Sequence, residues 1–180
     1  MRDISGHTKL RAQLERNALF DSLTQLPNRA SFTDRLRRAL ARSAGRDEAN
    51  FAVMFLDVDG FKSVNDRFGH SVGDLLLTEV ARRLESSVRP GDCVARFGGD
   101  EFTVLLGDIE YRDEAARIAE RILEGLSIPI LLHGAELEVA ASIGIAVNRS
   151  EYHQPDEMLR DADVAMYRAK AKGKARHEFF

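Results

Sequence analysis

Gly98-Gly99-Asp100-Glu101-Phe102 joins two short apolar segments, residues 93–97 and 102–106. Two apolar runs separated by a pair of glycines predict two strands with a tight hairpin between them. Glycine has no Cβ, so the pair can turn at positive φ and let a ligand lie against the backbone, although a plain tight turn would use the same residues. The sequence therefore predicts a hairpin that presents two acids at its turn.

A second pair of acids ends another predicted strand. Residues 51–58 form a nearly continuous apolar run, typical of a buried central strand, with Asp57 and Asp59 at its C-terminal end. If this strand pairs with the hairpin, the four carboxylates converge. Hard oxygen ligands without histidine or cysteine favour Mg²⁺, which usually bridges substrate phosphates. The alternative for any single acid is a solvated residue at a strand end.

Together with these three strands, the periodicity of the chain predicts nine elements in the order α-β-α-β-β-α-β-β-α. Their inner β-α-β-β-α-β portion favours an α+β fold with a ferredoxin-like antiparallel sheet and helices packed on it. Residues 60–70 are predicted to be a polar segment without an element. The other predicted elements are helices over 32–43 (capped by Ser31), 72–88 (with Ser71 and Asp74 as a capping box), 111–126 and 155–172, and strands over 128–132 and 137–147.

Composition limits the class of protein. The chain has 180 residues, 44% hydrophobic and 31% charged, which fits one ordinary globular domain. The single cysteine, Cys93, excludes an internal disulfide and suits a reducing cytoplasm. The net charge of −3 gives no global attraction to nucleic acid or anionic membrane. No apolar run is long enough for a membrane span and the N-terminus is too polar for a signal peptide, so we expect a cytoplasmic domain.

Further motifs accompany the hairpin, in the order and spacing of one family. They are Asp21-x-Leu23-Thr24-x-Leu26-Pro27-Asn28-Arg29, Asp57-Val58-Asp59-Gly60-Phe61-Lys62-x-Val64-Asn65-Asp66-x-Phe68-Gly69-His70-x-x-Gly73-Asp74, Arg96-Phe97, Ala141-Ser142-Ile143-Gly144-Ile145-Ala146 and Asp161-Ala162-Asp163-x-Ala165-Met166-Tyr167-x-Ala169-Lys170-x-x-Gly173-Lys174. With them, the chain resembles the GGDEF family of diguanylate cyclases from about residue 20 to residue 176.

The resemblance implies an activity and a partner. Members of this family condense two GTP into cyclic di-3′,5′-GMP (c-di-GMP) and release two pyrophosphates, using Mg²⁺ or Mn²⁺. Their fold is related to the palm of nucleotide cyclases and polymerases. Each protomer binds one GTP, and two protomers face each other so that each 3′-hydroxyl attacks the partner's α-phosphate. The resemblance therefore implies catalysis by a homodimer.

Residue roles follow from the resemblance in three groups: catalysis and metal binding, guanine recognition, and phosphate binding. Glu101 is implied as either a metal ligand or a group that helps to deprotonate the 3′-hydroxyl. The implied residues are Gly98, Gly99, Asp100 and Glu101 for catalysis; Asp57, the Val58 carbonyl, Asp100 and Glu101 for the metal; Asn65 and Asp74 for guanine; and Phe61, Lys62, Lys170 and Lys174 for the phosphates.

Arg89-Pro90-Gly91-Asp92 matches the family's Arg-x-x-Asp inhibitory site in its offset from the hairpin. An arginine can fork to a phosphate or stack on guanine, and an aspartate can accept guanine N–H donors. Arg117 or Arg121 on the following helix would complete such a site. The alternative is a Pro-Gly turn flanked by solvated charges. The resemblance predicts product inhibition by c-di-GMP through Arg89 and Asp92.

The chain departs from the common family pattern at two positions, and one of these departures together with the closing segment indicates a longer parent protein. Lys174 stands where the family commonly has arginine, which keeps the charge but loses the bidentate fork. Gly60 and the segment from Gly173 to Phe180 resemble proteins that also contain an EAL-type phosphodiesterase domain. We therefore expect a linker or signalling helix over 1–20, the cyclase domain over 21–177 and the start of a C-terminal linker over 178–180. The parent protein is expected to contain sensor and EAL domains. A membrane anchor in another part of that protein would be compatible with a cytoplasmic cyclase domain.

Two other functions compete with catalysis. In the first, the domain is a catalytically silent module that binds GTP or c-di-GMP and regulates an attached phosphodiesterase. In the second, it is a c-di-GMP effector that uses Arg89 and Asp92 alone. Silent family members usually have a damaged hairpin motif, whereas the acids, the glycines and the guanine-reading residues are all present here. The sequence therefore favours an active cyclase.

Overall fold

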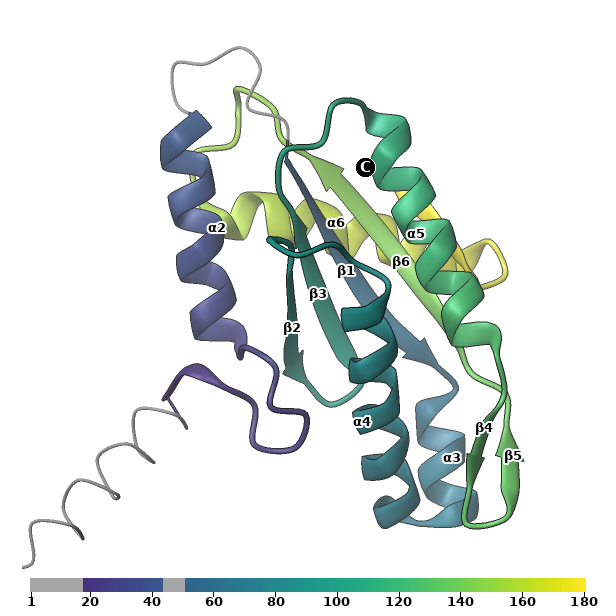
Figure 1. Cartoon of the computed structure of the whole chain (residues 1–180). Coiled ribbons are helices and arrows are strands. Elements are labelled where there is room, and N and C mark those ends of the chain that lie inside the picture. The colour runs from purple at the N-terminus through teal and green to yellow at the C-terminus, as the bar shows by residue number, and fades with distance from the viewer. Residues whose placement is uncertain (1–17, 44–50) are drawn as a thin grey trace, which may run out of the picture.

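One five-stranded sheet organises the computed structural model, which describes residues 18–43 and 51–180 (Figure 1). The strand order is β2 (Cys93–Gly98), β3 (Glu101–Leu106), β1 (Ala52–Asp59), β6 (Ala140–Val147) and β7 (Arg176–Phe179). Neighbouring strands are antiparallel except for β6 and β7, which are parallel. The predicted α+β class is confirmed, with a mixed sheet rather than a purely antiparallel one.

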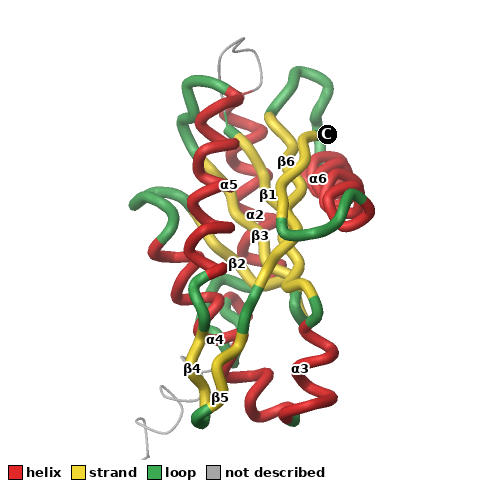
Figure 2. Tube along the Cα trace, turned by 90° about the vertical axis from the view of Figure 1, so that its right-hand side faces the viewer, coloured by secondary structure: helices red, strands yellow, loops and turns green. Residues whose placement is uncertain are grey.

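Helices cover both faces of this sheet and make two separate cores. α4 (His70–Ser86) and α5 (Arg112–Ser127) pack on one face, and α2 (Arg29–Ser43) and α6 (Pro155–Ala171) pack on the other (Figures 1 and 2). β1 lies at the centre of the sheet, so its side chains are buried on both faces from Ala52 to Leu56. This is why its sequence is a continuous apolar run rather than an alternating one.

The strand register places β1 against the hairpin. Asp57 is the partner of Glu101 on β3, and on the opposite edge of β1 it is the partner of Ser142 on β6. The C-terminal end of β1 and the β2–β3 turn therefore meet at one end of the sheet. This arrangement confirms the predicted pairing of the two strands.

Several local predictions are corrected. α2 begins at Arg29 because Asn28, rather than Ser31, caps it: the Ser31 N–H donates to Asn28 Oδ1 at 3.0 Å. α4 begins at His70 after Gly69 and has no side-chain cap, so the capping box of Ser71 and Asp74 is wrong. Residues 60–70 were predicted to lack an element but contain the helix α3 (Phe61–Phe68), in which no residue is fully buried although Phe61 and Val64 pack partly against the core.

The C-terminal strands also differ from the prediction. β4 (Ile130–Leu132) and β5 (Ala135–Leu137) form a separate two-stranded hairpin, and β6 begins only at Ala140. Residues 178 and 179, expected at the start of a linker, lie in β7, and the Phe180 N–H donates to the Ile145 carbonyl at 2.9 Å. The predicted N-terminal helix falls on residues 1–17, outside the described residues, except for its last three positions.

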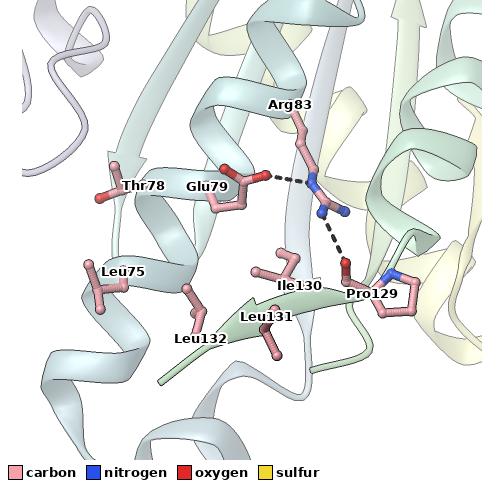
Figure 3. Close-up of a pocket in the computed structure, with 8 residues that line it drawn as sticks. All are labelled: Leu75, Thr78, Glu79, Arg83, Pro129, Ile130, Leu131 and Leu132. Carbon is pink, nitrogen blue, oxygen red and sulfur yellow. Dashed lines mark hydrogen bonds and ion pairs between the residues drawn. The ribbon is translucent and has the colours of Figure 1, made fainter. Parts of the chain in front are cut away.

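An open hollow of about 410 Å³ lies between α4 and β4 (Figure 3). Arg83 lines one end of it, is held by Glu79 at 2.9 Å, and donates to carbonyls at the C-terminal end of α5, including Gly125 at 3.0 Å, and to the Pro129 carbonyl at 3.3 Å. Hydrogen bonds from Arg82 and Arg83 lower the pKa of Glu79 to about 2. The hollow therefore contains a structural clamp between α4 and α5.

In the part of the chain that the structure describes, every helix is too short or too polar to cross a bilayer.

Candidate active site at the end of β1

The β2–β3 hairpin is held rigidly at its glycine turn. Gly98 and Gly99 have φ of 146° and 50°, which confirms that the turn needs positive φ. Arg96 donates from Nε and Nη2 to the Gly99 carbonyl at 3.1 and 2.8 Å, and from Nη1 to both oxygens of Asp21 at 2.9 and 3.1 Å. The Val58 N–H donates to the Asp100 carbonyl at 3.1 Å. The backbone that carries Asp100 and Glu101 is thus fixed from both sides.

Acidic side chains gather where this turn meets β1. Burial raises the pKa of Asp57, and the charges of Asp100 and Asp59 raise it further, against a hydrogen bond from Lys170 that lowers it. Burial likewise raises the pKa of Glu101, followed by the charges of Asp163, Asp57 and Asp100. Mutual repulsion of this kind requires the carboxylates to be close together. The site therefore has an excess of negative charge that a cation would relieve.

Lys170 already supplies one positive charge to this cluster. Its Nζ lies 2.9 Å from Asp57 Oδ2, and both side chains are mostly buried. The sequence assigned Lys170 to the substrate phosphates, whereas the structure pairs it with a predicted metal ligand. The α6 C-terminal end therefore reaches the acids directly.

The donor set fits a magnesium ion shared with a substrate. Asp57, Asp100 and Glu101 offer carboxylate oxygens and Val58 offers a backbone carbonyl at the same end of the sheet. Among the described residues, no three acidic, histidine or cysteine side chains converge closely enough to form a ready-made metal cage. Mg²⁺ usually keeps several waters and binds through one or two carboxylates plus phosphates, so such a cage is not required.

Asn65 and Asp74, the predicted guanine-reading residues, lie close together. Asn65 on α3 packs against Gly73 on α4 so tightly that a Cβ on Gly73 would lie 1.9 Å from Asn65 Oδ1. That oxygen is buried and has no hydrogen-bond partner among the described residues, and a buried acceptor without a partner is unfavourable. Asp74 follows Gly73 and is exposed. The contact of α3 with α4 thus places an unsatisfied acceptor on Asn65 next to the residue that precedes the exposed Asp74.

Phe61 and Lys62 form the first turn of α3, immediately after β1. Gly60 precedes them in a left-handed conformation, with φ of 76°, which turns the chain from the strand into the helix. The first N–H groups of a helix have no intrahelical acceptor and favour anions such as phosphate. The structure therefore places these two residues where their amides can bind phosphate.

Asp59 and Lys174 have positions that the sequence did not predict. Asp59 accepts hydrogen bonds from Ser142 Oγ at 2.9 and 3.1 Å and from the Ala175 N–H at 3.1 Å. Its oxygens are therefore used within the protein, which leaves Asp57, Asp100 and Glu101 of the four predicted acids as candidate metal ligands. Lys174 lies in the exposed turn after α6, next to Ala175.

Arg89 and Asp92 lie away from these acids, beside the N-terminal end of α5. The buried Asp92 carboxylate accepts from the Arg89 and Gly107 N–H groups, each at 3.1 Å. Arg89 donates to Glu114 at 2.9 Å and to the carbonyls of Gly107 and Asp108. An open hollow of about 540 Å³ lies beside it. The hollow is lined by Arg89, Asp108, Glu110, Glu114, Arg117, Ile118 and Arg121.

Sequence reasoning did not assign roles to Asp21, Arg96, Ser142 or Asp163, although each lies in one of the motifs. Arg96 lies two residues before the glycine pair, and this short spacing could have predicted its contact with the turn. The distance in sequence between Asp21 and Arg96 hid their ion pair, and nothing in the sequence showed that α6 directs Asp163 toward Glu101.

Comparison with known proteins gives the family. The family model described as "Diguanylate cyclase, GGDEF domain" matches residues 18–176. The bifunctional diguanylate cyclase/cyclic di-GMP phosphodiesterase MucR of Pseudomonas aeruginosa is 47% identical over 91% of this chain, and diguanylate cyclase TpbB of the same species is 45% identical over 91%. The chain spans only 24% of the length of MucR and 38% of the length of TpbB.

Solved structures agree with the sequence comparison. The GGDEF domain of TpbB has a TM-score of 0.84 at 42% identity, and the match covers 89% of this chain and 93% of that one. The coiled coil and GGDEF domain of DgcB from Caulobacter crescentus, in complex with c-di-GMP, has a TM-score of 0.87 at 27% identity, covering 99% and 94%. The match of sequence, fold and hairpin motif leads to one conclusion: the chain belongs to the GGDEF-domain family of diguanylate cyclases.

Proposed function

We propose that this domain is a Mg²⁺-dependent diguanylate cyclase that condenses two GTP into c-di-GMP and releases two pyrophosphates. The observation that carries the proposal is the register of β1 and β3, which pairs Asp57 with Glu101 beside the rigid turn of Asp100. Relatives named as diguanylate cyclases support it. GTP is a cytoplasmic nucleotide, so we place the domain in the cytoplasm, whatever anchors its parent protein.

The residues of the site have distinct roles in this proposal. Asp57, Asp100, Glu101 and the Val58 carbonyl would hold Mg²⁺ (or Mn²⁺), which supplies charge neutralisation on the triphosphate when bound. Glu101 completes the metal shell or accepts the proton of the attacking 3′-hydroxyl. The α3 amides of Phe61 and Lys62 bind phosphate oxygens. Asp100 keeps its position because the hydrogen bonds of Arg96 and Val58 fix the turn on either side of it.

Guanine recognition rests on Asn65 and Asp74. A carboxylate accepts from the N1–H and amino group of guanine, a donor pattern that adenine lacks. The unpartnered Asn65 Oδ1 gains a partner when a base with suitable donors enters. Discrimination between GTP and ATP is then large, because a mismatched base leaves buried polar groups unpaired.

The reaction needs a second copy of the chain. One protomer provides acids and phosphate-binding groups for a single GTP, so the two 3′-hydroxyls must approach from facing protomers. We propose a catalytic homodimer with the two β1 ends opposed. Because the chain spans a minor part of its curated relatives, we also propose that EAL and sensor domains accompany it in a longer protein.

Product inhibition belongs to the hollow beside Arg89. Arg89, Arg117 and Arg121 offer three cations around one opening, and arginine suits phosphate and guanine together. The solved DgcB structure contains c-di-GMP, which supports binding of this ligand by the fold. Arg89 must exchange its contact with Glu114 for the ligand, so we propose that binding rearranges the start of α5.

The experiment that tests the function compares the parent with Asp100→Ala. Each protein is incubated with GTP and Mg²⁺, and products are separated by chromatography. The proposal requires c-di-GMP from the parent and at least a hundredfold less from Asp100→Ala (an order-of-magnitude expectation for a lost metal ligand). Tight GTP binding without any c-di-GMP would favour the silent module, and c-di-GMP binding without GTP binding would favour the effector.

A further inference from the structure

The turn after α6 has an unfavourable backbone. Gly173, Lys174 and Ala175 all have positive φ, at 113°, 63° and 48°. Glycine adopts such angles freely, but residues with a Cβ do so at an energetic cost. Successive non-glycine residues in this conformation persist only where surrounding contacts hold them, and such strain concentrates at functional sites.

A carboxylate on β1 holds this turn to the sheet. Asp59 Oδ2 accepts from the Ala175 N–H at 3.1 Å, and both Asp59 oxygens accept from Ser142 Oγ at 2.9 and 3.1 Å. Ser142 is fully buried on β6, so its hydroxyl fixes the direction of the carboxylate. The turn has local contacts as well: the Lys174 N–H donates back to the Ala169 carbonyl at 3.1 Å. The contact with Asp59 differs from these local contacts because it joins the turn to β1, which is distant in the sequence.

Asp59 also lies in the sequence between Asp57, a candidate metal ligand, and the phosphate-binding turn that begins at Gly60. It comes two residues after Asp57 and directly before Gly60, which begins the phosphate-binding turn of α3. The residue that it holds, Ala175, follows Lys174. We propose that Asp59, oriented by Ser142, is a positioning residue that keeps the strained turn at the end of β1 and so keeps the Lys174 ammonium beside the substrate triphosphate. This inference rests on the proposed function and on the phosphate-binding role that the family resemblance implies for Lys174.

The inference has a specific consequence. Without the carboxylate, the Ala175 N–H loses its acceptor, and the turn relaxes toward right-handed conformations that its residues prefer. Lys174 then samples many positions and binds phosphate less well. Because Asp59 acts through Lys174 alone in this scheme, its loss has no effect on nucleotide affinity once the Lys174 ammonium is gone. The two substitutions are therefore predicted to be non-additive.

A double-mutant cycle of Asp59 and Lys174 tests this non-additivity. Calorimetry measures how each variant binds a non-hydrolysable α,β-methylene analogue of GTP with Mg²⁺. We expect Asp59→Ala and Lys174→Ala each to weaken binding about tenfold, the size of one charge-assisted hydrogen bond. The double variant should bind as Lys174→Ala does. Lys172→Ala is the matched control, since Lys172 lies in the same turn but pairs with Glu178 at 2.8 Å; it should bind like the parent. Ser142→Ala, a milder change, should fall between parent and Asp59→Ala.

A second readout needs no nucleotide. Hydrogen exchange at the Ala175 amide should be at least about tenfold faster in Asp59→Ala than in the parent, because the amide loses its acceptor. Unchanged exchange there, or additive losses of affinity in the double variant, would overturn the positioning role. If the parent itself binds no GTP analogue while exchange at Ala175 accelerates as expected, the proposed function fails and the link to Lys174 fails with it, but the Asp59 contact stands.

Discussion

The Lys170 ammonium lies 2.9 Å from the Asp57 carboxylate, so the C-terminal end of α6 supplies a cation to the acids at the end of β1. α6 packs on the face of the sheet opposite α4 and α5 (Figure 2). Its ion pair with Asp57 places Lys170, near the C-terminal end of α6, at that end of β1. The ion pair offsets part of the repulsion among Asp57, Asp100 and Glu101. Lys170 thus lies beside a candidate metal ligand, and the family resemblance also assigns it to the substrate phosphates.

Replacing Lys170 distinguishes its ion pair with Asp57 from its proposed contact with the substrate phosphates. Lys170→Met should lower kcat/KM for GTP by about 10- to 100-fold, because one charge-assisted contact to phosphate is lost. Half-saturation by Mg²⁺ should occur at an equal or lower concentration, since no ammonium competes for Asp57. Magnesium titrations at fixed GTP measure both, with Lys170→Arg as the charge-conserving control. A Lys170→Met enzyme that needs much more Mg²⁺ would contradict this view of the ion pair.

Gly73→Ala should damage guanine binding with little effect on the fold. The added Cβ would lie 1.9 Å from Asn65 Oδ1, so the Asn65 side chain must move, and it is a side chain rather than backbone that yields. We expect GTP affinity to fall about tenfold and discrimination against ATP to decrease. Competition binding with GTP and ATP measures this change. Equal GTP affinity in parent and variant would mean that the position of Asn65 is not used in recognition.

Arg89→Ala should relieve product inhibition. The lost guanidinium is the group that can fork to a phosphate or stack on a base, so the inhibition constant for c-di-GMP should rise at least about tenfold. Arg82→Ala provides a control, because Arg82 is an exposed arginine that pairs with Glu79 outside the hollow. Initial rates at increasing c-di-GMP give the constants. Inhibition that is identical in Arg89→Ala and the parent would exclude Arg89 from the inhibitory site.

Gly144→Ala tests the packing that brings α6 to the site. A Cβ on Gly144 would lie 1.9 Å from the Ala162 carbonyl oxygen and 2.1 Å from the Met166 nitrogen, so β6 and α6 would have to separate. We expect a loss of roughly 3 kcal/mol or more in the free energy of unfolding. Gly107→Ala is the control, since no atom lies within 4 Å of its added Cβ; its stability should change by about 0.5 kcal/mol or less. Urea unfolding compares the two, and equal stabilities would contradict the packing.

Much of the fold follows from apolar periodicity, and the exceptions have physical reasons. The buried β1 and the amphipathic α5 and α6 have strong patterns, so their bounds differ little from the prediction. α3 has only eight residues and none of them is fully buried, so its apolar positions Phe61, Val64 and Phe68 were not recognised as the face of a helix. β7 is an edge strand of four residues, too short and polar to stand out from a linker.

The site was predictable in its residue types but less so in its contacts. The resemblance named Asp57, Asp100 and Glu101, and the strand register brings them together. The pairing of Lys170 with Asp57, and of Asp59 with the Ala175 amide, depends on where α6 and the following turn lie against the sheet. Such contacts join residues far apart in the chain, and no spacing within one motif encodes them.

Catalysis by two facing protomers can be measured as the rate of c-di-GMP formation from GTP and Mg²⁺ at increasing protein concentration. In the proposed homodimer each protomer binds one of the two GTP molecules, so the rate per protomer should rise with protein concentration until the dimer is saturated, and EDTA or Asp100→Ala should abolish it. Stable GTP binding with no c-di-GMP at any protein concentration would contradict the account.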